Sequence, residues 1–152
     1  MQTGSGLSLL CRADTRLFAL PLQSVVETMR PLPIEAVAGA PDFVLGLAVI
    51  RGMAVPVVDS GRMLNGKPSS IARFVLLKVG ERRIALAVAA VLGLRALTPA
   101  RLQELPPLIR GADADVIAAI GALDAELLMV LRAVRIVPED LPATMRQDAL
   151  AS

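Results

Sequence analysis

The 152-residue sequence predicts a mainly β protein, and three observations support this fold class. About ten short apolar runs are separated by turn and loop residues, a spacing typical of β-barrels and β-sandwiches. Hydrophobic residues make up 55% of the chain, enough to fill the core of one domain or of two small shared subdomains. Strands this apolar would aggregate through open edges, so we expect a closed or nearly closed body.

The first part of the chain predicts a hairpin followed by a loop. The apolar runs 7–13 and 17–22 flank a polar turn and form the hairpin. A proline then suits the first turn of a short helix over 22–25, and 26–30 returns to an extended pattern. We expect residues 31–41 to form a surface loop, because their prolines fix φ and remove backbone donors.

Residues 43–59 are the central feature of the sequence, two apolar strands joined at one arginine and one glycine. Charged residues are absent from 43–50 and from 52–58, so each flank is apolar enough to be buried on both faces. Gly52 permits a positive φ, which lets the backbone turn and leaves the Arg51 side chain projecting from a rigid corner. Arg51 is then either a recognition residue for another molecule or the solvated tip of a hairpin.

The middle of the chain predicts a short helix and three further strands. Residues 59–66 have the acidic or serine cap and the glycine stop of a short helix. A polar, proline-containing loop follows at 67–70. The apolar runs 72–79 and 83–91 predict a hairpin, and 92–97 extends as another strand.

The last part predicts one more hairpin and a tail. Residues 114–123 and 126–131 favour two strands, although the alanine-rich stretch 116–120 also has helical propensity. A last short helix is expected within 128–137. The ordered domain is expected to end at Pro138, with a C-terminal tail beyond it.

The composition excludes several kinds of active site. Without histidine the chain cannot build a Ser-His-Asp or Cys-His nucleophile system, or an imidazole metal site. The single cysteine, Cys11, is either a small buried hydrophobe or a reactive thiol, and it cannot form an internal disulfide. Residues 113–115 open like a calcium loop, but Ile117 and Ala118 replace the next ligand and the turn glycine. We therefore expect no metal, no cofactor and no enzymatic activity.

Paired carboxylates leave one alternative open. Asp59 with Glu27, or Asp124 with Glu126, would suit acid–base chemistry if the folded chain brought them together. The chain would then be a small ligand-binding β-barrel or an acid-based hydrolase. Asp59 also has a purely structural interpretation as a helix cap.

Charge and hydropathy limit the possible partners. The net charge is only +2, no window is rich in Lys and Arg, and Tyr and Trp are absent, so we expect no nucleic-acid binding. The mean hydropathy of +0.63 is high, but uncharged stretches such as 84–94 are shorter than the roughly 18 residues of a spanning helix. No basic region precedes an apolar segment at the N-terminus. We expect a cytoplasmic protein with no direct membrane insertion.

Residues 46–59 have the sequence GLAVIRGMAVPVVD. This stretch resembles the signature of the CheW-like chemotaxis coupling domains, in which the pattern G-[VI]-x-x-[LI]-R-G-x-x-[VIL]-P-V-[VI]-D forms a central strand pair. Upstream, residues 18–27 are similar to the opening strand of that family and its V-x-E element, which ends at Glu27. The pair Ala40-Pro41 is similar to the small-Pro pair that precedes the signature. The matching signature positions are Gly46, Ile50, Arg51, Gly52, Pro56, Val57 and Asp59.

The resemblance implies a fold of two intertwined five-stranded SH3-like β-barrels with short helices. Residues 7–138 would form one CheW-like domain of two shared subdomains, with the chain crossing near 67–84 and residues 139–152 as a tail. The resemblance also implies a non-enzymatic adaptor that couples the cytoplasmic tip of methyl-accepting chemoreceptors to the regulatory domain of a CheA-type histidine kinase. The implied partner-binding residues are Arg51, Gly52, Ile50, Val57 and Glu27.

One strand departs from the family pattern. Many family members carry an acidic pair in a G-[LI]-x-V-D-x-V strand, whereas residues 87–91 of this chain are Ala-Val-Ala-Ala-Val. A contact that relies on a carboxylate at Ala89 or Ala90 is therefore missing. This departure is consistent with a specialised signalling array or with an output other than swimming.

Overall fold

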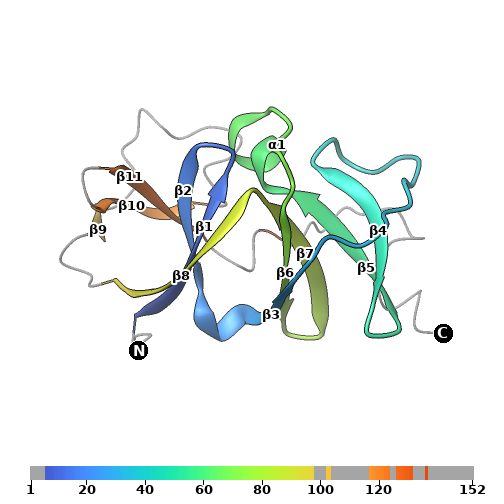
Figure 1. Ribbon diagram of the computed structural model, residues 1–152, viewed down its shortest axis with the longest axis horizontal. Helices are drawn as coiled ribbons and strands as arrows, with labels where there is room; N and C mark the ends of the chain where they lie inside the picture. The colour runs from blue at the N-terminus through green and yellow to red at the C-terminus, as the bar shows by residue number, and fades with distance from the viewer. Residues whose placement is uncertain (1–5, 98–101, 104–116, 124–125, 132–135, 137–152) are drawn as a thin grey trace.

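The computed structural model describes residues 6–97, 102–103, 117–123, 126–131 and 136 of the chain. These residues form two curved β-sheets that lie side by side, with one short α-helix above them (Figure 1). The predicted mainly β fold with short helices is confirmed.

The first sheet, which we call sheet A, has the strand order β8-β1-β2-β11-β10-β9. Its strands span Leu7–Ala13 (β1), Arg16–Pro21 (β2), Ala90–Ala96 (β8), Leu102–Gln103 (β9), Ile117–Leu123 (β10) and Glu126–Leu131 (β11). Neighbouring strands are antiparallel, except that β2 and β11 pair in parallel. The two-residue β9 makes sheet A six-stranded, one strand more than the resemblance implies.

The second sheet, sheet B, has the order β3-β6-β7-β5-β4. Its strands span Val25–Met29 (β3), Val44–Ile50 (β4), Met53–Asp59 (β5), Arg73–Val79 (β6) and Arg82–Val88 (β7). Here β5 and β7 pair in parallel and the other neighbours are antiparallel. The edges of sheet B are therefore β3 and β4.

Local sequence signals predicted several of these elements. The β1–β2 hairpin lies where expected, and a short helix, α1 (Ser60–Asn65), follows the central hairpin. The Asp59 carboxylate caps this helix by accepting a hydrogen bond from the Gly61 amide at 2.9 Å, and Gly66 ends it with a φ of 73°. Residues 117–123 form a strand, so the helical alternative for this stretch is wrong.

Two sequence expectations need correction. Residues 83–91 are not one strand, because β7 ends at Val88 and β8 begins at Ala90. The first flank of the central hairpin is not buried on both faces, since Val49 is 69% exposed. The reason is the position of β4 at the edge of sheet B.

The chain changes sheets twice. It enters sheet B through the 3-10 helix η1 (Leu22–Ser24) and returns to sheet A at Ala89, on either side of the region near 67–84 where the resemblance implies a crossing. A short helix was predicted within 128–137. Residues 128–131 of that range belong to strand β11 instead, Ile136 is helical, and the other residues of the range lie outside the described part of the chain. The predicted tail, 139–152, lies outside them as well.

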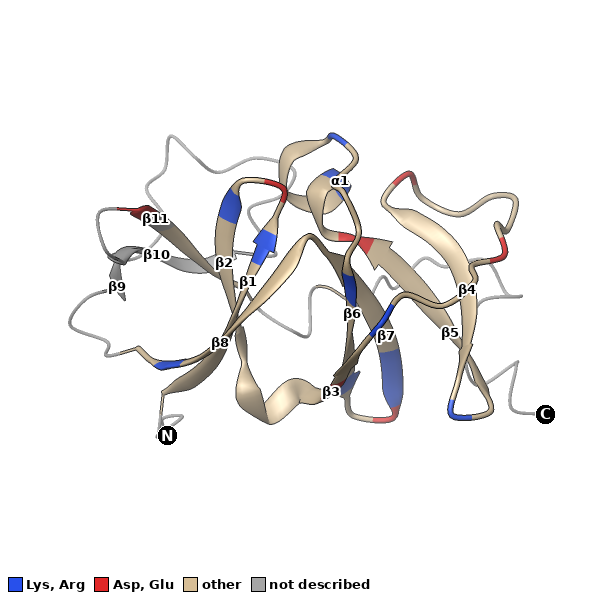
Figure 2. Cartoon of the chain, viewed as in Figure 1, with Lys and Arg blue, Asp and Glu red and all other residues tan. Residues whose placement is uncertain are grey.

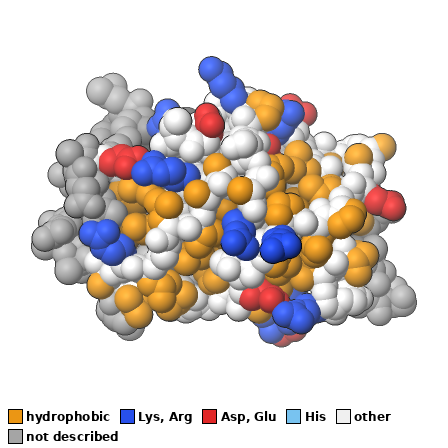
Figure 3. Space-filling view, viewed as in Figure 1, with side chains coloured by type: hydrophobic (Ala, Val, Ile, Leu, Met, Phe, Trp, Pro, Cys, Tyr) orange, Lys and Arg blue, Asp and Glu red, His pale blue; other side chains and the backbone are white. Residues whose placement is uncertain are grey.

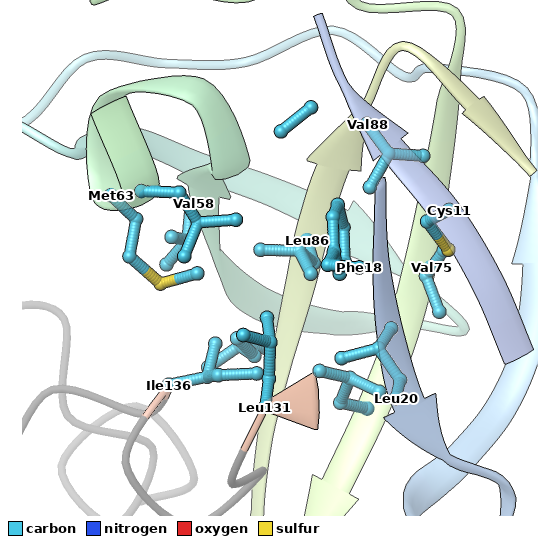
Figure 4. Close-up of a cluster of buried hydrophobic side chains, with 14 of the residues drawn as sticks. Cys11, Phe18, Leu20, Val58, Met63, Val75, Leu86, Val88, Leu131 and Ile136 are labelled. Atoms are coloured by element: carbon cyan, nitrogen blue, oxygen red, sulfur yellow. The ribbon is translucent and has the colours of Figure 1, made fainter. Parts of the chain in front are cut away.

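The largest hydrophobic cluster joins the two sheets. Phe18 and Leu20 of β2 pack in the same cluster as Val75 of β6 and Leu86 of β7, and each of these side chains is fully buried (Figure 4). Smaller clusters fill each sheet separately. Because the main cluster draws on both sheets, neither sheet would keep its core without the other.

The cysteine belongs to the cluster that joins the sheets. Cys11 is fully buried, and desolvation by this burial raises the pKa of its thiol to about 12. Of the two interpretations of Cys11, the structure supports the small buried hydrophobe.

In the described part of the chain, every helix falls short of the length and hydropathy that a membrane span requires.

Candidate partner-binding site

A two-residue turn of Arg51 and Gly52 joins β4 to β5. Ile50 and Met53 pair across it, and both turn residues have positive φ, 54° at Arg51 and 78° at Gly52. Positive φ at both positions is the requirement of a type I′ hairpin turn. A Cβ added at Gly52 would meet no atom within 4 Å, so glycine is needed there for its backbone conformation and not for space.

The Arg51 guanidinium forms a bidentate ion pair with Glu27. Its Nε donates to Oε2 at 2.9 Å and its Nη2 donates to Oε1 at 2.7 Å. The hydrogen bond from Arg51 lowers the pKa of the Glu27 carboxyl, and the same bond raises the pKa of Arg51. The structure thus brings together two residues that the resemblance placed at the site separately.

This ion pair connects the two ends of sheet B. Glu27 lies on the edge strand β3, whereas Arg51 lies beside the opposite edge strand β4. The pair therefore links strands that the backbone ladder leaves unpaired. It closes the sheet on itself, which is the closure expected for so apolar a set of strands.

A backbone bridge supports the same closure. Glu35, in the loop after β3, exchanges two hydrogen bonds of 2.8 Å with Leu47 of β4. Gly46 makes this approach possible, because a Cβ built on it would lie 2.0 Å from the Glu35 carbonyl oxygen. The glycine that opens the signature is thus explained by close backbone contact.

The turn is well exposed to solvent. The Arg51 side chain is 69% exposed and the Glu27 side chain is 28% exposed. Val49 and Met53, on either side of the turn residues, are exposed apolar side chains that the sequence analysis did not single out. Figure 2 shows the basic turn projecting beyond the strands at the free end of β4 and β5. A cation with apolar neighbours at a fixed corner is a suitable surface for another protein.

Two of the five candidate residues are not on the surface. Ile50 is 3% exposed and Val57 is 0% exposed, and both pack in the cluster inside sheet B. Alternation along the strands turns them inward, away from any partner. Their side chains can therefore position the turn but cannot contact another molecule in this structure.

The described carboxylates of the two proposed pairs are each bound by other groups. Asp59 is 2% exposed and accepts hydrogen bonds from backbone amides, including Gly61, while Glu27 is held by Arg51. Glu126 is paired with Arg12, and Asp124 lies outside the described residues. Within the described ranges no group of three or more His, Cys, Asp or Glu residues could hold a metal.

Sequence reasoning missed the Arg12–Glu126 pair. Arg12 Nη2 donates to Oε1 at 3.0 Å and its Nη1 donates to Oε2, so this pair is bidentate as well. It lies at a cavity of about 180 Å³ that is also lined by Leu10, Leu17, Leu92 and Leu94. No local signal could have revealed this pair, because its members are 114 positions apart.

Comparisons with known proteins identify the family. The family model of the CheW-like domain matches residues 8–140. A "Probable chemotaxis protein CheW" from Rhizobium etli is 26% identical over 123 residues, which cover 79% of this chain and 79% of the relative. The crystal structure of scaffolding protein TtCheW from Thermoanaerobacter tengcongensis matches with a TM-score of 0.73 and 18% identity, over 84% of this chain and 89% of that one. At that identity the structural match shows the fold alone. The chain therefore belongs to the CheW-like domain family, as the resemblance implied.

Proposed function

We propose that this protein couples the cytoplasmic tip of methyl-accepting chemoreceptors to the regulatory domain of a CheA-type histidine kinase, and that it acts in the cytoplasm. The proposal is supported by the family and by the printed descriptions of its relatives as a chemotaxis protein and a scaffolding protein. Residues 7–138 would be the working domain, made of two shared subdomains, and residues 139–152 would be a tail.

The β4–β5 turn is the proposed contact, and the observation that carries this proposal is the state of Arg51. Glu27 holds two of its N–H groups, so three of the five guanidinium N–H groups remain for a partner. The side chain is 69% exposed yet fixed in direction by its ion pair and by its position in the turn. A fixed donor group loses little conformational freedom on binding, which favours affinity.

Each of the other candidate residues has a distinct part in this proposal. Gly52 gives the turn its conformation, and Glu27 orients the guanidinium. Ile50 and Val57 anchor the two strands in the core of sheet B. The exposed Val49 would add apolar contact area next to the cation.

Gel filtration of the purified protein with a CheA-type kinase and a receptor fragment tests the proposal. We expect co-elution of the unaltered chain, and binding weakened at least about tenfold in Arg51→Glu, since arginine is a frequent hot-spot residue. Arg16→Glu, at the exposed start of β2, is the matched control and should bind normally. If the unaltered chain co-elutes with neither protein, the proposal is wrong.

A charge swap separates contact from closure. In the double variant Arg51→Glu, Glu27→Arg the ion pair that closes sheet B can re-form with reversed polarity. If Arg51 contacts the partner directly, this variant regains thermal stability without regaining binding. If the double variant binds like the unaltered chain, Arg51 acts only in closure and the contact lies elsewhere.

A further inference from the structure

Two arginines lie side by side where β3 ends and β6 begins. The strands β3 and β6 are antiparallel, and Met29 pairs with Phe74. The next residues in this register are Arg30 and Arg73, which therefore face each other across the ladder. Figures 2 and 3 show basic residues gathered at this place on the molecule.

Both arginines point outward from sheet B. Phe74 is a buried member of the cluster inside the sheet, and Met29 packs against that cluster. Because side chains alternate along a strand, Arg30 and Arg73 lie together on the opposite face, and both are exposed. Among the described residues neither guanidinium has a hydrogen-bond or ion-pair partner, in contrast to the paired Arg12 and Arg51.

Among the described residues, those next to the two arginines in the ladder, Met29, Phe74 and Val88, carry no negative charge. On its other side Arg73 faces Val88 of β7, and the chain continues there through Ala89 and Ala90. Like charges directly opposite each other in a sheet are destabilising. The register therefore presents two cations that the fold brings together without neutralising them, and an anionic ligand would remove that repulsion.

We propose that the Arg30–Arg73 pair binds an acidic segment of a partner protein, one that carries two closely spaced carboxylates. Two guanidiniums on one face match two carboxylates by charge and by bidentate geometry. The same edge strand, β3, carries Val26, which is 48% exposed, so this edge of sheet B offers apolar contact area as well as the two cations. A protein segment that alternates acidic and apolar residues fits this combination. Nucleic acid does not, because the sequence has no Tyr or Trp on which bases could stack.

This site is distinct from the proposed contact at Arg51 and goes beyond the proposed function. It can be tested without a kinase or a receptor, using the purified full chain and a fluorescent peptide of alternating glutamate and leucine. We expect saturable binding that weakens about two- to fivefold in Arg73→Gln and in Arg30→Gln, since each variant removes one exposed ion pair between an arginine and a peptide glutamate. Arg16→Gln, which removes an exposed arginine elsewhere, should leave the affinity unchanged.

Three further measurements decide the class of ligand. A peptide with glutamine in place of glutamate should not bind, and inorganic phosphate at the same ionic strength should compete only weakly. Equal binding by Arg73→Gln, or equal loss in Arg16→Gln, would overturn the site. Tighter binding of inorganic phosphate or single-stranded DNA than of the acidic peptide would overturn the assignment to a protein segment. Melting curves of each variant show whether it is folded, since both arginines lie on the surface.

Discussion

The two bidentate arginine–glutamate pairs share their chemistry but differ in what they connect. Arg12 lies within β1, and Glu126 opens β11, so this pair reaches across β2 inside one continuous ladder. Arg51 lies in a turn, and its pair with Glu27 joins the two edges of a sheet that the ladder leaves open. The first pair reinforces strands that backbone hydrogen bonds already hold together, whereas the second makes a connection that these bonds do not make.

The arginines of the two pairs also differ in how far their side chains are exposed to solvent. The Arg12 side chain is 33% exposed and also donates to the Thr15 carbonyl, whereas the Arg51 side chain is 69% exposed. Arg12 thus has two of its five guanidinium N–H groups left on a side chain at a cavity wall, whereas Arg51 has three left on a more exposed one. The comparison indicates that sheet A uses its pair for structure, and that the pair of sheet B combines closure with presentation of a donor group.

The largest effect is expected at the backbone bridge that supports closure of sheet B. Gly46→Ala places a Cβ 2.0 Å from the Glu35 carbonyl oxygen at a φ of 148°, so the loop or β4 must move. We expect a loss of about 3–5 kcal/mol in the free energy of unfolding, measured by denaturant titration.

Gly93→Ala in sheet A is the matched control for this prediction. Gly93 has a φ of 117°, but a Cβ there would meet no atom within 4 Å, so only conformational strain is introduced. We expect a loss of about 1–2 kcal/mol. Similar losses in both variants would show that the close contact at Gly46 does not limit stability.

The next effect concerns binding and compares the two arginines directly. Arg51→Gln should weaken co-elution with the kinase and receptor fragment at least about fivefold, whereas Arg12→Gln should leave it within about twofold. Both variants should melt at a somewhat lower temperature, because each leaves a glutamate without its cation. An equal loss of binding in Arg12→Gln would contradict the division between structure and presentation.

Local patterns predicted the elements but not the way they are assembled. The turn at Arg51–Gly52 and the cap at Asp59 follow from residue types within a few positions, and both are present. The parallel pairings β5–β7 and β2–β11 depend on chain segments far apart in sequence, which no local pattern specifies. The Arg12–Glu126 pair depends on one of these pairings and was missed for that reason.

The site was predicted in part. Glu27 and Arg51 were both named from the family pattern, but their ion pair becomes visible only once β3 and β4 are placed at opposite edges of one sheet. An uncharged run does not say which of its residues face solvent on an edge strand. Val49 was therefore expected to be buried, but it is 69% exposed, whereas Ile50, a partner contact only by family resemblance, is buried.

The smallest effect is a pH dependence of stability that both pairs should share. The hydrogen bonds from the arginines lower the pKa of Glu27 and of Glu126 in the folded protein. A carboxyl whose pKa is lower when folded contributes stability that is present above its unfolded value of 4.5 and is lost as the pH falls through its folded pKa. As the pH falls from about 5 to about 3, the range in which carboxyl groups titrate, the melting temperature of the unaltered chain should fall. It should fall by less in Glu27→Gln and in Glu126→Gln, because each variant lacks one of these carboxyl groups.

Glu81→Gln is the control for this titration, because Glu81 lies in the β6–β7 turn and has no ion-pair partner among the described residues. Its melting curve should follow that of the unaltered chain. Raising the salt concentration to about 1 M should reduce the contribution of both ion pairs to the melting temperature, since exposed charges are screened at short range.

If the Arg51–Glu27 pair closes sheet B as the geometry indicates, Glu27→Gln should also speed hydrogen exchange at the β3 and β4 edges, and Glu126→Gln should not. Equal exchange at these edges in both variants would assign the closure to the Glu35–Leu47 bridge alone.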